Sequence, residues 1–109
     1  MMTLSEVLIT IEEIQDETVV QEFVHHGWVK PVEQEGNWLF DPVDIARIRL
    51  VHQLRHELLV EDETMSLVLS LMDQLYTTRH QLKQMCQAIS KQPRSVQAEI
   101  FSLMEEKNR

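Results

Sequence analysis

The chain has 109 residues, of which 43% are hydrophobic, so it is long enough to form one domain with a buried core. Only two glycines and three prolines interrupt it, which predicts long helices and a mainly α fold. No run of about 18 apolar residues could cross a membrane. The N-terminus lacks the basic segment of a signal peptide, and Cys86 alone excludes an internal disulfide. We therefore expect a soluble, cytoplasmic protein.

The net charge of −8 is confined to the first 41 residues, which hold nine acids and one base, Lys30. Residues 42–109 hold nine acids and nine bases and are therefore neutral. Non-specific DNA binding depends on cations that displace the counterions of the phosphates. The charge distribution argues against DNA binding by the N-terminal region. It fits either a basic partner or an acidic surface that only keeps the protein in solution.

In chain order, the β-branched run at residues 8–11 predicts a small strand. Asp16 is a good N-cap for a helix that Gly27 would end. Only fifteen residues separate Ile11 from Gly27, which is room for one proper helix and a preliminary turn. The sequence therefore predicts a curtailed helix-turn-helix.

Residues 28–32 and 37–40 predict two strands joined by a turn of about four residues, 33–36. Asp41 and Pro42 then predict the start of a helix that runs to about Val60. A hairpin between two helices is the outline of a winged-helix unit. The helix has apolar residues on two nearly opposite faces, so we expect it to lie between two layers.

A long helix of about 40 Å is predicted from about Thr64 to Lys91. Apolar residues recur along it with the heptad spacing of a coiled coil, at Val68, Leu71, Leu75, Leu82, Met85 and Ile89. This spacing predicts a dimerisation seam. After Pro93, a tail helix capped by Ser95 is expected to fold back on the long helix or on a second subunit. We interpret residues 1–60 as a winged-helix unit, 61–92 as the long helix and 93–109 as the tail helix.

Residues with catalytic or metal-binding potential are few. His52 and His56 have the i, i+4 spacing that can chelate a metal, but no second histidine or cysteine pair accompanies them. The sequence contains no nucleophile motif and no glycine-rich phosphate loop. We expect neither an enzyme nor a bound metal or cofactor.

Four segments occur in an order that resembles the bacterial chaperone-modulator family (CbpM): GWVKP at 27–31, WLFD at 38–41, LRHEL at 54–58 and LVLSLMD at 67–73. The similarity covers about residues 8–90, and that family is itself similar to the N-terminal part of MerR-type winged-helix regulators. The resemblance implies binding to the J-domain of a DnaJ-like co-chaperone and inhibition by competition with Hsp70. It also implies self-association into a homodimer.

A J-domain engages Hsp70 through a basic helix, so a competitor should present carboxylates. The predicted contact residues are Glu12, Glu13, Asp16, Glu17, Glu22, Glu33, Glu35 and Trp28. The predicted dimerisation residues are Val68, Leu75, Leu82, Met85 and Ile89. Two alternatives remain at this point: a MerR-like DNA-binding transcription regulator, and a dimeric scaffold whose seam is its function.

Overall fold

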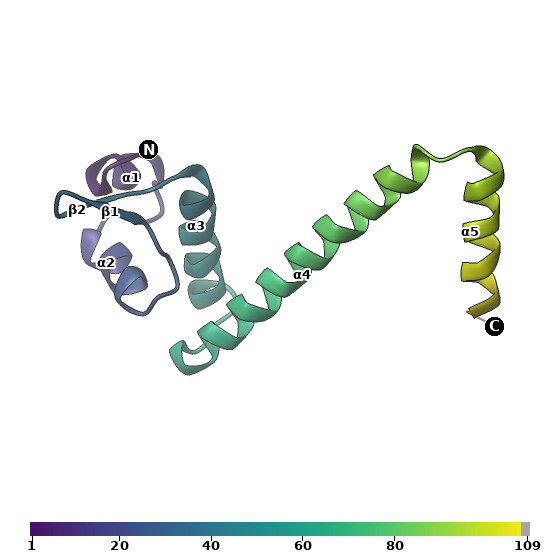
Figure 1. The fold of residues 1–109 in the computed structure, drawn as a ribbon. Helices are drawn as coiled ribbons and strands as arrows, with labels where there is room; N and C mark the ends of the chain where they lie inside the picture. Colours follow the sequence, from purple (N-terminus) through teal and green to yellow (C-terminus); the bar gives the residue numbers. More distant parts are fainter. Residues whose placement is uncertain (108–109) are drawn as a thin grey trace. The chain divides into compact units, whose positions relative to one another are not determined.

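The structure is a computed structural model that describes residues 1–107 (Figure 1). It confirms a mainly helical fold with a small antiparallel hairpin and a long helix near the C-terminus. The elements are α1 (Leu4–Thr10), α2 (Glu17–His25), β1 (Val32–Gln34), β2 (Asn37–Leu39), α3 (Pro42–His56), α4 (Asp62–Ser90) and α5 (Arg94–Lys107). Two compact units divide within α4, the first being Met1–Leu69 and the second beginning at Ser70. None of the described helices has the length and apolar character needed to cross a membrane.

The strand predicted at residues 8–11 is wrong, because this segment belongs to α1 and the turn after it. Thr3 caps the helix, its hydroxyl accepting a hydrogen bond from the Glu6 N–H at 3.3 Å. Val7 and Ile11 are four residues apart and both are buried, so burial of one helical face outweighs the strand preference of the β-branched residues. The helix-turn-helix therefore has both helices, of seven and nine residues, where the sequence predicted only the second.

The second helix, α2, begins and ends where the sequence predicted. The Asp16 carboxylate accepts a hydrogen bond from the Thr18 N–H at 3.0 Å, and this bond lowers the pKa of Asp16. At the other end Gly27 has a φ of 77°, a left-handed conformation that favours glycine. The Gly27 N–H donates to Val24 and the Trp28 N–H to Phe23, each at 3.0 Å, which is the Schellman pattern of helix termination.

The hairpin is shorter than predicted. Its register pairs Val32 with Leu39, and the turn has two residues rather than four. Glu35 and Gly36 both have positive φ, 52° and 79°, as in a type I′ turn. Residues 28 and 29, predicted as strand, lie instead in the core. Phe40 extends the pairing on the other side, exchanging two backbone hydrogen bonds of 2.8 Å with Met2.

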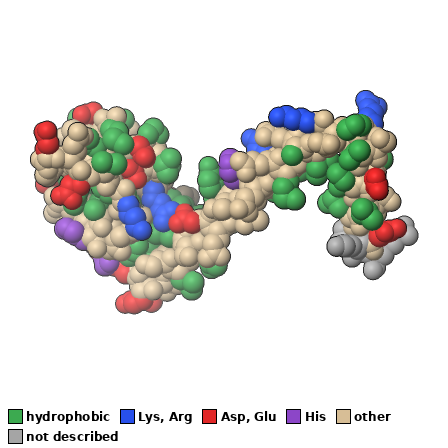
Figure 2. Space-filling model, in the orientation of Figure 1, with side chains coloured by type: hydrophobic (Ala, Val, Ile, Leu, Met, Phe, Trp, Pro, Cys, Tyr) green, Lys and Arg blue, Asp and Glu red, His purple; other side chains and the backbone are tan. Residues whose placement is uncertain are grey.

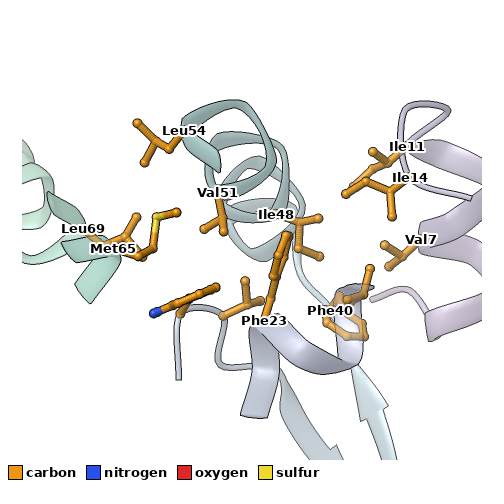
Figure 3. Close-up of a cluster of buried hydrophobic side chains, with 13 residues drawn as sticks. Val7, Ile11, Ile14, Phe23, Phe40, Ile48, Val51, Leu54, Met65 and Leu69 are labelled. Atoms are coloured by element: carbon orange, nitrogen blue, oxygen red, sulfur yellow. The ribbon is translucent and has the colours of Figure 1, made fainter. Parts of the chain in front are cut away.

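The third helix, α3, lies between two groups of core residues, as the sequence predicted. Figure 3 shows Ile48 directed toward the α1 and α2 side chains, and Val51 and Leu54 directed toward Met65 and Leu69 at the start of α4. The helix ends at His56 rather than near Val60, because the chain turns through a left-handed conformation at Leu59. The apolar faces are only partly buried, since Val43, Leu58 and Leu59 are exposed.

One hydrophobic cluster joins α1, α2, the residues after Gly27, Phe40, α3 and the first turns of α4. Met65 and Leu69 belong to this cluster, with 0% and 2% of their surface exposed. The start of the long helix is therefore part of the N-terminal core. From Leu71 onward, in contrast, most of the large apolar side chains of α4 are exposed in the single chain.

We predict that Met65→Ala lowers the free energy of unfolding by about 2–4 kcal/mol, because it removes a fully buried side chain and leaves a cavity. The measurement is urea unfolding followed by circular dichroism. Leu67→Ala, two residues along the same helix and 60% exposed, is the matched control and should change stability by less than about 0.5 kcal/mol. Equal effects of the two substitutions would contradict the inclusion of the α4 start in the core.

Candidate protein-binding surface

The guanidinium of Arg55 holds together three elements of the N-terminal unit. It binds the Glu22 carboxylate on α2 at 2.6 Å and the Asp62 carboxylate at the start of α4 at 2.7 Å. It also lies over the rings of Phe23 and Trp28, 5.8 and 5.7 Å from their centroids. The hydrogen bond from Arg55 lowers the pKa of Glu22, and the two carboxylates raise the pKa of Arg55.

Trp28 was predicted as a contact residue, but it belongs to the core. Only 3% of it is exposed, and its indole N–H donates a hydrogen bond to the Ser66 hydroxyl at 3.2 Å. The His26 ring stacks on the indole, with centroids 4.2 Å apart. Because its ring is enclosed on these sides, Trp28 cannot anchor a partner without the core opening. Trp38, the other tryptophan of the chain, is half-buried and lies on β2 of the hairpin.

The other two arginines of residues 1–69 are also bonded within the unit. The Arg47 side chain donates to the Trp28 carbonyl at 2.9 Å, and the Arg49 side chain donates to the Thr10 carbonyl at 3.3 Å. No lysine or arginine occurs on α1, on α2 or on the hairpin strands and their turn. Lys30, exposed between α2 and β1, is the remaining cation of the first 69 residues.

The predicted acidic residues occupy several elements, and most are exposed. Figure 2 shows carboxylates distributed over the visible face of the N-terminal unit. Glu22 differs, because it is half-buried and paired with Arg55. The exposed positions are Glu12 and Glu13 in the turn after α1, Asp16 and Glu17 at the start of α2, Glu33 on β1, and Glu35 in the hairpin turn.

An open depression of about 840 Å3 lies where α1, α2 and the hairpin meet, and we call it the hairpin hollow. Its lining comprises Thr3, Leu4 and Ser5 at the start of α1, Gln21 on α2, and residues 34–39 of the hairpin. Of the predicted acidic residues, Glu35 lines it directly. Glu17 accepts a hydrogen bond from the Gln21 amide at 3.5 Å and so lies beside it.

Glu13 lies elsewhere, at a smaller depression of about 230 Å3 that it shares with Arg49, His52 and Glu57. The structure therefore does not gather all the predicted acids around one site. Burial and the neighbouring His56 lower the pKa of His52, whose Nδ1 is buried and makes no hydrogen bond. The two histidine rings are 4.3 Å apart at their centroids.

One trio of potential metal ligands occurs among residues 1–107: Glu22, His26 and Asp62, with ligand atoms within 4.8 Å of one another. The Arg55 guanidinium binds both carboxylates of this trio and supplies the positive charge that a metal ion would bring. The two carboxylates are therefore better explained as partners of Arg55, with His26 beside Glu22, and the trio does not include the His52–His56 pair that the sequence singled out.

The predicted dimerisation residues lie along α4. Val68 is half-buried against the N-terminal core, and Ile89 is half-buried within the second unit. Leu75, Leu82 and Met85 are each more than half exposed in the single chain. Phe101, Leu103 and Met104 on α5 are also more than half exposed, so the described residues do not cover the apolar side of the tail helix.

Sequence reasoning missed the central position of Arg55 and the lining of the hairpin hollow. Arg55 and Glu22 are 33 positions apart, and no local pattern connects them. The hollow depends on α1, where the sequence predicted a strand at residues 8–11 and no helix, so no sequence pattern placed Thr3, Leu4 and Ser5 near the hairpin. The Glu35–Gly36 pair was the one available signal, because a glycine at this position indicates a tight turn.

The sequence model of the family described as MerR HTH family regulatory protein matches residues 3–87 of the chain. This match covers both helices of the helix-turn-helix, the hairpin, α3 and most of α4. Such proteins are typically non-catalytic regulatory or binding proteins. A search of curated proteins found no match.

We predict that Arg55→Gln lowers the free energy of unfolding by about 1–2 kcal/mol near neutral pH, a value reduced because the paired carboxylates are partly exposed. The pKa of Glu22 is depressed in the folded state, so the pair stabilises above the unfolded-state pKa of about 4.3. This stability is lost as the pH falls through the folded-state pKa. Urea unfolding at neutral and acid pH should therefore show a smaller difference between variant and wild type in acid.

The control for Arg55→Gln is Arg79→Gln, which removes the same charge from an exposed position on α4. It should change stability by less than about 0.5 kcal/mol at either pH. A destabilisation by Arg55→Gln that stayed constant down to pH about 2 would show that the ion pairs are not its cause.

Proposed function

The chain belongs to the MerR HTH family of regulatory proteins, and we propose that it acts on a protein partner. That family includes both CbpM-like modulators and transcription regulators. We place the chain with the former, as a protein that binds the J-domain of a DnaJ-like co-chaperone and inhibits it by competing with Hsp70. The observation that carries this proposal is the absence of lysine and arginine from α1, α2 and the hairpin.

These are the elements with which a winged helix-turn-helix protein would approach DNA. Here they carry Glu6, Glu17, Glu22, Glu33 and Glu35 instead of cations. A duplex carries about one negative charge for each 1.7 Å of its axis, so this surface would be repelled. The three arginines of the unit lie on α3 rather than on α1, α2 or the hairpin, and they bond to Trp28, Thr10, Glu22 and Asp62.

The same carboxylates suit a basic helix of a protein. A competitor for a J-domain must offer negative charge to the basic surface that Hsp70 would otherwise contact, and opposite charge accelerates association. The proposed contact set is the exposed part of the predicted one: Glu12, Glu13, Asp16, Glu17, Glu33 and Glu35. Trp28 is left out because it is buried, and Glu22 is left out because it is paired with Arg55.

We further propose that α4 pairs with α4 of a second copy of the chain. Leu75 and Leu82 are seven residues apart and exposed, and Met85 extends the same face. A seven-residue repeat is self-complementary, so a second copy is the partner that this spacing fits. Pairing would remove from water a row of apolar side chains that the described residues leave uncovered.

We predict that the protein binds a purified DnaJ-like co-chaperone through its J-domain and reduces the stimulation of Hsp70 ATPase activity. Binding is measured by calorimetry at about 50 and about 200 mM NaCl, and it should weaken at the higher salt because the carboxylates are exposed to screening. Glu33→Gln combined with Glu35→Asn should weaken it by more than about tenfold at low salt. Asparagine is chosen at position 35 because it tolerates the positive φ of that turn.

The control for this pair is Glu105→Gln combined with Glu106→Gln on α5, which changes the net charge equally at exposed positions far along the chain. It should bind as the wild type does. Affinity that did not change with salt would rule out the acidic contact surface. Retardation of duplex DNA at low salt, with no J-domain binding, would favour the transcription regulator instead.

We predict that the wild-type chain is a dimer by light scattering coupled to size-exclusion chromatography. Leu75→Glu combined with Leu82→Glu should give a monomer, because the substitutions place charges in the apolar seam. Thr77→Glu combined with Gln84→Glu, at exposed polar positions of the same helix, adds the same two charges away from the seam; this matched control should stay dimeric. A wild-type chain that is monomeric at micromolar concentration would refute the proposed pairing of α4 with α4.

A further inference from the structure

The hairpin hollow has a chemical character that the acidic surface alone does not explain. Its walls carry hydroxyl and amide side chains, among them Thr3, Ser5, Gln21 and Asn37, and its apolar part includes Leu4 and the half-buried Trp38. An open hollow of about 840 Å3, lined by polar residues and by Trp38, has room for one long side chain of a partner.

The charge around the hollow has one sign. Glu35 lines it, Glu17 is bonded to the lining residue Gln21, and Glu6 and Glu33 are one position from Ser5 and Gln34 in sequence. None of its lining residues is a lysine or arginine. A cation entering the hollow would meet carboxylates, amide oxygens and hydroxyl oxygens, all of which accept hydrogen bonds.

Trp38 gives the hollow a surface that suits a cation with an apolar stem. The rings of His25 and Phe40 pack against Trp38 in T-shaped arrangements, with centroids 5.9 and 6.5 Å away and interplanar angles of 74° and 89°. These contacts fix the orientation of the indole. Lysine and arginine side chains lay their methylene groups on apolar surface and keep the charged end near polar atoms, and tryptophan is the best aromatic partner for a cation.

We propose that the hairpin hollow receives one long cationic side chain, lysine or arginine, from a basic segment of the protein partner. The stem lies against Trp38 and the charged end reaches Glu35 and the oxygens of the rim. This inference rests on the proposed function, which supplies the basic protein partner. It adds one anchoring site to the broad acidic surface. Nucleic acid is disfavoured, because no lysine or arginine lines the hollow and a phosphate would meet the Glu35 carboxylate.

The chain contains two tryptophans, and this allows a direct test. The indole N–H signals of Trp28 and Trp38 are followed by heteronuclear NMR in the ¹⁵N-labelled full chain, with Trp38→Leu for assignment. The probes are the purified J-domain protein and pentalysine. The Trp38 signal should shift during both titrations. The Trp28 signal should stay in place, because the indole is buried and its N–H is bonded to Ser66 within the chain.

Affinity for the J-domain protein is then measured for two variants. Trp38→Leu keeps an apolar side chain but removes the ring, and Glu35→Asn removes the charge without straining the turn. Each should weaken binding about tenfold, whereas Glu105→Gln should not. An unchanged Trp28 signal shows that the variant is folded, and Glu35→Asn serves as the second variant if Trp38→Leu does not fold.

The outcomes separate this inference from the proposed function. If the J-domain protein binds while the Trp38 signal stays fixed and both variants bind as the wild type does, the hollow is not the anchor, although the function stands. If the J-domain protein fails to bind but pentalysine shifts Trp38, the hollow accepts cations and the proposed partner is wrong. A Trp38 shift produced by duplex DNA, or by raising the concentration of the chain alone, would overturn the cationic occupant.

Discussion

The arrangement of the first 69 residues depends on the contacts that the Arg55 guanidinium makes. The guanidinium connects α2, α3 and the start of α4 through two carboxylates, and it covers the rings of Phe23 and Trp28. A planar, permanently charged group with several donors can satisfy both carboxylates at once, whereas a lysine could not do so with the same geometry. Beneath it, the indole of Trp28 is bonded to Ser66, so the long helix begins in a fixed position on the core.

The use of arginines inside the unit determines the charge of its surface. Arg47, Arg49 and Arg55 each bond to a carbonyl or carboxylate of another element, and these bonds hold α3 against α1, α2 and the residues after Gly27. These arginines therefore connect elements within the unit. The charged side chains exposed on α2 and the hairpin strands are carboxylates, with no lysine or arginine among them. The placement of the arginines on α3 thus affects both the stability of the fold and the charge of the surface.

Local signals in the sequence predicted the parts of the fold that local bonds stabilise. Asp16, Gly27 and Asp41 make hydrogen bonds to residues two or three positions away, and each was readable from residue type and spacing. The end of α1 was misread as a strand because isoleucine and threonine favour strands unless a buried helical face decides otherwise. Trp28 was misplaced because its burial depends on α3 and α4. The hairpin hollow needs three elements that are far apart in sequence, and no pattern within one element contains it.

Different residues determine the fold and the choice of partner, and the positions of the core residues explain why. Val7, Phe23, Phe40 and Ile48 face inward and hold α1, α2, the hairpin and α3 together. Glu17 and Glu35 face outward, and no core contact depends on their charge. A change between lysine and glutamate at such exposed positions costs little packing energy. It reverses the sign of the electrostatic potential at the surface that a partner contacts. A helix-turn-helix with a hairpin is therefore evidence of fold alone, and the charges on α2 and the hairpin are the evidence that bears on function.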